Sequence, residues 1–130
     1  MKLFKKMKDG GNESTVTGYW LIEWKFLFSI CILKFEGASR EAYHSHAFHC
    51  ISWIISGQLK EEMLDGRIFN LFPSLLPFLT TRKDMHKVSS VTPVTWLITF
   101  RGPWANTWQE WLPEDNGFIT LSNGRKIVSN

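Results

Sequence analysis

The sequence predicts an all-β protein that forms a single domain. Short runs of aromatic and β-branched residues recur along the chain, and each run ends at Gly, Pro or a polar turn. No segment keeps apolar residues at the 3.6-residue spacing of a helix. The chain has 130 residues, enough for one hydrophobic core, whereas two cores would each be marginal. These observations are typical of a β-sandwich or β-barrel.

The N-terminus differs from the rest of the chain in composition. It is polar, basic and contains paired glycines, which is typical of a solvated tail. We therefore expect residues 1–15 to be a flexible basic tail and residues 16–130 to be the folded domain. The lysines that make it basic are Lys2, Lys5, Lys6 and Lys8.

The first expected strands lie on either side of a histidine-rich stretch. Residues 19–25 and 26–36 are rich in aromatic and branched side chains, and the second run ends at Gly37. A polar turn and the stretch HSHAFH follow. The apolar run after it, CISWIISG, predicts another strand that stops at Gly57.

Further strand signals follow in the second half of the chain. Residues 58–65 alternate in polarity and end at an Asp-Gly dipeptide, which favours a hairpin. Residues 68–81 contain two prolines, so we expect an edge or irregular strand there. Residues 95–100, TWLITF, predict a strand in the core.

The C-terminal region is expected to form an arm packed on the domain. Trp104, Trp108 and Trp111 are spaced by four and three residues, which fits one face of a helix covering a core. Residues 117–128 predict two short strands around the turn Ser122-Asn123-Gly124.

Charge and cysteine content exclude several classes of protein. The net charge is +3, but beyond the N-terminus Lys and Arg alternate with Glu and Asp, so nucleic-acid binding is not expected. The two cysteines form no CxxC pair, which favours a reducing compartment. The longest apolar run is too short to span a bilayer, and no signal peptide is recognisable. We therefore expect a soluble cytoplasmic protein without membrane contact.

Three histidines are candidate metal ligands. On a strand, His44 and His46 would point to the same face, and His86 follows a later turn from which it could supply a third ligand. Imidazole suits zinc, iron, nickel or copper, so the pattern leaves the metal open. The alternative is a pair of locally hydrogen-bonded histidines with no metal.

The sequence resembles the cupins in two places. HSHAFHCISWIISGQLKE is similar to the first cupin motif and RKDMHKV to the second, and the resemblance covers about residues 35–102. It implies a cupin-like β-barrel (a double-stranded β-helix or jelly roll), here with a Trp-rich C-terminal arm. It also implies one divalent transition metal, Fe, Zn, Mn or Ni, held by the histidines at the barrel mouth.

A narrower resemblance rests on four segments, LFSICILKF, HSHAF, FRGPWANTWQEW and TLSNGRK. Together these segments are similar to small cupin-like proteins of phages and prophages. This implies a viral or prophage origin and the host cell cytoplasm as the location. It implies no particular activity.

The first motif departs from the cupin pattern at one position. The carboxylate expected four residues after the second histidine is replaced by Cys50. Cys50 could be a thiolate ligand or a small buried apolar residue, and His49 could reach the site only if a bulge displaced the strand. A barrel without metal is the remaining alternative.

Other polar residues near the motifs are weaker candidates. Glu61 and Glu62 are expected on a solvated hairpin, and they could act as acid and base only if they approached the histidines. Arginines and an aromatic residue at the mouth would attract a carboxylate or phosphate. The candidate substrate-binding residues are Arg40, Tyr43, Arg82 and Arg101.

Three functions follow from these features. The first is a metal-binding protein, with oxygenase or isomerase activity on a small anionic substrate as the cupin resemblance implies. The second is a non-catalytic phage factor that binds a small molecule or a host protein, in counter-defence or regulation. The third is a structural homo-oligomer, such as a homodimer paired through edge strands and apolar runs like LFPSLLPFL.

Overall fold

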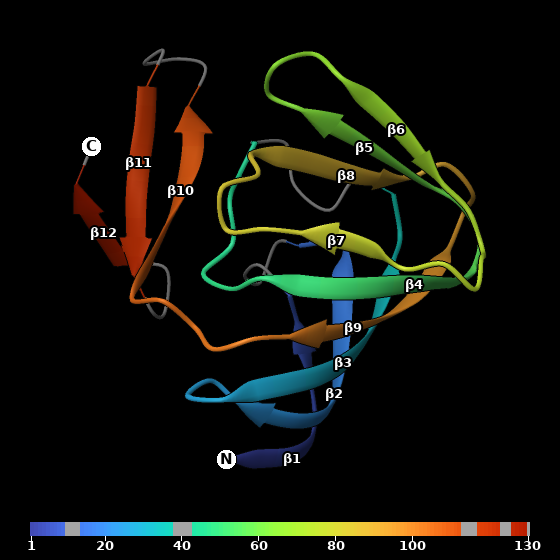
Figure 1. Ribbon diagram of the computed structural model, residues 1–130, viewed down its shortest axis with the longest axis horizontal. Coiled ribbons are helices and arrows are strands. Elements are labelled where there is room, and N and C mark those ends of the chain that lie inside the picture. Colours follow the sequence, from blue (N-terminus) through green and yellow to red (C-terminus); the bar gives the residue numbers. More distant parts are fainter. Residues whose placement is uncertain (10–13, 38–42, 113–116, 123–125, 130) are drawn as a thin grey trace.

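The computed structural model describes residues 1–9, 14–37, 43–112, 117–122 and 126–129. Within these residues the chain forms β-strands and no helix, as the sequence predicts (Figure 1). The strands are β1 Lys2–Lys8, β2 Val16–Trp24, β3 Phe28–Phe35, β4 Cys50–Ser56, β5 Leu59–Met63, β6 Ile68–Leu71, β7 Phe78–Thr80, β8 His86–Ser90, β9 Thr95–Arg101, β10 Thr107–Leu112, β11 Gly117–Ser122 and β12 Lys126–Ser129.

The largest sheet has six antiparallel strands in the order β1-β2-β3-β9-β4-β7. Its strands alternate buried and exposed residues, as in β3, where Cys31, Leu33 and Phe35 point inward. Because the alternation has a period of two, one face of the sheet is apolar and covers the core.

Two three-stranded sheets complete the fold, in the orders β6-β5-β8 and β10-β11-β12. His44 forms a bridge with His86 on β8 and another with Glu110 on β10. The backbone at His44 therefore joins the two small sheets and places this histidine between them.

The core lies inside the layers formed by these sheets. It is an apolar cluster in which Trp20, Leu33, Leu59 and Leu97 are almost fully buried. The turn between β4 and β5 is made at Gly57, whose φ of +89° is one that side chains with a Cβ rarely adopt. The expected end of the strand at Gly57 is confirmed.

The proline-containing segment lies at the margins of the sheets. β6 and β7 come from residues 68–81, and each is an edge strand of its sheet. Pro73 and Pro77 lie between the two strands, where their missing N–H breaks no ladder, and the expectation of edge or irregular strands is confirmed.

The N-terminus is ordered as a strand where the sequence predicts a tail. β1 pairs with β2 from Lys2 to Lys8, and Lys5 forms an ion pair of 2.6 Å with Glu23. Pairing with β2, the next strand in the chain, decides this conformation, and the composition of residues 1–15 does not reveal such pairing. The flexible-tail prediction for residues 1–15 is therefore wrong over Lys2–Lys8.

The Trp-rich arm is a strand and not a helix. Residues Thr107–Leu112 pair with β11, and an odd spacing on a strand puts Trp108 and Trp111 on opposite faces. Trp108 contacts Trp104, while Trp111 contacts Phe118. The single helical face predicted for the tryptophans is wrong because inter-strand pairing overrides their spacing.

The expected C-terminal strands are present as β11 and β12. The Asn-Gly turn predicted between them lies outside the described residues. No helix in the described part of the chain is long and apolar enough to cross a membrane.

Candidate metal centre

Three histidines converge in the interior of the fold. His44, His46 and His86 each offer a ring nitrogen, and these atoms lie within 4.8 Å of one another. The three ring centroids are 4.9 to 5.1 Å apart, with the rings close to perpendicular or steeply inclined. His44 and His86 are buried and His46 is half-buried. The structure thus brings together the three residues that the sequence singled out.

Backbone pairing holds the two buried histidines side by side. His44 N–H donates to the His86 carbonyl over 2.9 Å, and His86 N–H donates back to the His44 carbonyl over 3.0 Å. His46 lies outside any strand, two residues beyond this bridge. The sequence predicts both His44 and His46 on a regular strand, but only the single bridge at His44 is strand-like.

Glu61 contacts the cluster directly. Its Oε2 lies 2.6 Å from His86 Nδ1. A carboxylate only accepts, so Nδ1 carries the proton and His86 Nε2 is left as the nitrogen that faces the other histidines. Histidine ligands of metals commonly donate their second N–H to a carboxylate in this way.

The solvated-hairpin prediction is wrong for Glu61 and correct for its neighbour. Leu59 and Met63 are buried, and strand alternation places Glu61 on the same inner face. This alternation is the signal in the sequence by which Glu61 could have been identified. Glu62 points the other way, where hydrogen bonding and the charges of Lys60 and Lys87 lower its pKa.

The geometry of the cluster fits a metal ion. His46 Nε2 and His86 Nε2 are 3.0 Å apart. Histidine nitrogens bind zinc at about 2.0–2.1 Å, so two nitrogens at this separation can share one ion. The described histidines could therefore hold a metal, and imidazole ligands alone leave its identity open.

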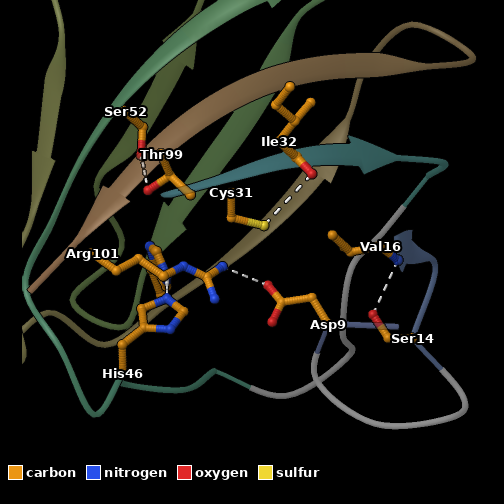
Figure 2. A network of polar contacts seen from close by, with 10 residues as sticks. Asp9, Ser14, Val16, Cys31, Ile32, His46, Ser52, Thr99 and Arg101 are labelled. Atoms are coloured by element: carbon orange, nitrogen blue, oxygen red, sulfur yellow. Dashed lines mark hydrogen bonds and ion pairs between the residues drawn. The ribbon is translucent and has the colours of Figure 1, made fainter. Parts of the chain in front are cut away.

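The cluster opens on a cavity of about 530 Å³ inside the fold. Arg101 also lines it, at 4% exposure, and its Nη2 donates to Asp9 over 2.8 Å (Figure 2). The guanidinium lies 5.6 Å from the Trp20 ring centroid and 4.6 Å from that of Phe48. Burial is the largest single influence on the pKa of Arg101 and lowers it, but the charges of Asp9, Cys31 and Cys50 and the hydrogen bond to Asp9 together outweigh burial, so the pKa is raised. Arg101 is therefore a fixed positive charge at the cavity wall.

The other candidate residues are dispersed. Cys50 lines the cavity but is not part of the histidine cluster, whereas His49 is exposed and its Nδ1 accepts the Arg82 N–H. Arg82 is exposed, and Tyr43 is half-buried with Lys87 Nζ 5.0 Å from its ring centroid. Arg40 lies outside the described residues.

Comparison with known proteins gives similarity in structure but not in sequence. No family model matches the sequence, and no curated protein matches it. A sugar phosphate isomerase of the cupin superfamily from Silicibacter pomeroyi superposes with a TM-score of 0.63 at 9% identity, covering 89% of this chain and 77% of that one. The chain has the cupin fold.

Two more structures support the same fold. An RmlC-like cupin from Shewanella frigidimarina has a TM-score of 0.59 at 18% identity, covering 77% of this chain and 84% of that one. KdgF from Halomonas sp. has a TM-score of 0.59 at 16% identity, covering 79% of this chain and 94% of that one. Identities this low show the cupin fold alone, and these comparisons do not support the expected phage or prophage origin.

Proposed function

We propose that the protein binds one divalent transition metal through His44, His46 and His86 and uses it on a small anionic molecule held in the cavity. The observation that carries this proposal is the 3.0 Å separation of the His46 and His86 Nε2 atoms, with Glu61 on the far nitrogen of His86. A carboxylate behind a histidine orients the ring and makes it a stronger ligand.

Each residue around the ion has a separate part in this proposal. His44 and His86 are fixed by their paired backbones, so two of the three ligands are held in place before a metal arrives. His46 stacks on Phe48 at 5.1 Å between ring centroids, which limits its rotation. Three histidines leave coordination positions for water or substrate.

A bound metal would polarise an oxygen atom of the substrate or activate oxygen. These are the isomerase and oxygenase classes that the cupin resemblance implies. Arg101 supports an anionic substrate, because a buried cation beside the cluster favours negative charge.

The test is metal content, measured by elemental mass spectrometry on protein purified without a polyhistidine tag. We expect about one metal ion per chain, lost in His44→Ala and in His86→Ala. His49→Ala is the matched control, because His49 is exposed and outside the cluster, and it should keep the metal. Metal retained by both cluster variants would refute the site.

A second candidate is a binding module that works without metal, including a phage factor directed at a host molecule. The observation that favours it is Cys50, which stands where the cupin motif has a carboxylate. It requires a ligand to bind equally well to wild-type protein and to the metal-free His44→Ala variant.

A homodimer is the third candidate, favoured by exposed apolar side chains near the edge strand β7. Leu75, Leu76 and Leu79 are 96%, 80% and 64% exposed. An exposed edge strand with apolar neighbours is a surface that proteins often cover. Sedimentation should show a dimer that Leu79→Lys dissociates, and monomers at all concentrations would exclude it.

A further inference from the structure

Two buried hydrogen-bond donors in the cavity have no acceptor. Among the described residues, Arg101 Nε and Trp104 Nε1 are buried without a hydrogen-bond partner, and both side chains line the cavity. Such a donor costs about 1–3 kcal/mol when it is left unsatisfied, so native proteins rarely keep one without a reason. Acceptor oxygens of a ligand would satisfy them.

The two donors lie beside the histidine cluster. Phe48 connects them, since its ring centroid is 4.6 Å from the Arg101 guanidinium carbon and 5.1 Å from the Trp104 centroid. The same ring stacks on His46. A molecule that reached both donors would therefore lie next to the proposed metal.

Local charge favours an anion at this position. Asp9 balances Arg101, and Glu23 balances Lys5, while Lys8, Lys25 and Glu61 are the other charged residues of the lining. Lys25 adds a further positive charge, with Nζ 4.5 Å from the Trp104 ring centroid, and it also lines the cavity. Positive charge beside unpaired N–H groups suits a carboxylate, whose two oxygens accept from two donors.

The rest of the lining is largely apolar. Leu33, Leu59 and Leu97 are buried core residues that face the cavity. The hydroxyls of Ser52 and Thr99 also line it, but they are bonded to each other at 3.0 Å. An alkyl or aryl group of a ligand would bury apolar surface against these leucines.

We propose that the cavity binds a small organic acid with an apolar body. Its carboxylate accepts hydrogen bonds from Arg101 Nε and Trp104 Nε1, and its body lies against the leucines of the core. This inference rests on the proposed function for the place of the metal beside the acid. It narrows the anionic substrate to a carboxylic acid.

The first experiment compares probes by titration calorimetry on zinc-loaded protein. Hexanoate and benzoate carry the carboxylate and an apolar body, hexan-1-ol lacks the charge, and glucose 6-phosphate is polar throughout. At least one acid should bind at least tenfold more tightly than the alcohol and the sugar phosphate. Binding of neither acid, or tighter binding of glucose 6-phosphate, would overturn the proposal.

The second experiment removes one donor and keeps the ring. Trp104→Phe retains the aromatic contact with Phe48 but lacks Nε1–H, so acid affinity should fall about tenfold while hexan-1-ol binding is unchanged. Trp53→Phe is the matched control, because Trp53 Nε1 already donates to the Leu75 carbonyl. Equal losses in both variants would overturn the role of Trp104.

Metal content measured on the same samples separates the two proposals. Wild-type protein that holds zinc but binds neither acid contradicts the acid site and leaves the metal site intact. Wild-type protein that holds no metal after zinc loading contradicts the metal site. If it still binds hexanoate, and Trp104→Phe lowers that affinity, the acid site is retained.

Discussion

The histidine cluster and the Arg101 region lie in one cavity but present opposite chemistry to it. The cluster brings imidazole nitrogens to within 4.8 Å of one another. Their lone pairs can coordinate a metal ion. Arg101 and Trp104 present N–H groups without acceptors. The first arrangement suits a cation and the second an anion, as the two proposals require.

The two regions also differ in how the chain assembles them. His44 and His46 are neighbours in the sequence and meet His86 through one backbone bridge. The Arg101 region joins strand β9 to Asp9, 92 positions away in the chain, and to Trp20 on β2. A local motif can reveal the first region, while only the folded sheet creates the second.

The largest effect should come from breaking the charge balance in the Arg101 region. Asp9→Ala leaves a buried guanidinium without its carboxylate, which should lower the free energy of unfolding by about 3 kcal/mol. Urea unfolding measures this. Asp65→Ala, which breaks an exposed pair with Arg67, should cause no measurable change. Equal effects of the two variants would show that Arg101 is not held as described.

The next largest effect should come from changing Glu61, which contacts the histidine cluster through His86. Glu61→Gln replaces the charged partner of His86, and metal affinity should fall by about 10–100-fold. Competition with a chelator measures the affinity. Glu62→Gln, on the outer face of the same strand, should leave it unchanged. A loss of the same size in Glu62→Gln would mean that overall charge, and not orientation of His86, sets the affinity.

A smaller effect should come from the buried thiol of Cys31, whose ionisation is sensitive to Arg101. Burial raises the pKa of the Cys31 thiol to about 12, from an ordinary value of 9.0, although the charge of Arg101 opposes this. The thiol is neutral when protonated, so its contribution to stability is complete below pH 9.0 and is lost as the pH rises towards 12.

Urea unfolding between about pH 8 and about pH 10.5 measures this loss, which is about 1.4 kcal/mol per pH unit for one group. Cys31→Ala should remove that part of the pH dependence. An unchanged slope in the variant would show that the thiol does not resist ionisation.

The features found from the sequence are those that local patterns encode. Period-two alternation and turn residues identified most strands, and the HxH spacing identified His44 and His46. His86 came from the likeness of its surroundings to a second cupin motif. These signals need no knowledge of which strands pair.

The features that were missed depend on which strands pair. β1 exists because β2 offers an edge, and the tryptophans of β10 lie on a strand because β11 pairs with it. Glu61 is the exception, because its position between Leu59 and Met63 already marked an inward-facing carboxylate. The partnership of Asp9 with Arg101 has no local signal.

The most direct test of the metal site is a zinc titration followed by long-range proton–nitrogen NMR of the histidine rings. The geometry predicts that one equivalent of zinc shifts Nε2 of His46 and of His86, while His86 Nδ1 stays protonated against Glu61. The His49 ring, which is exposed and accepts the Arg82 N–H, should not respond. Zinc-dependent shifts at His49, or none at His46 and His86, would contradict the three-histidine centre.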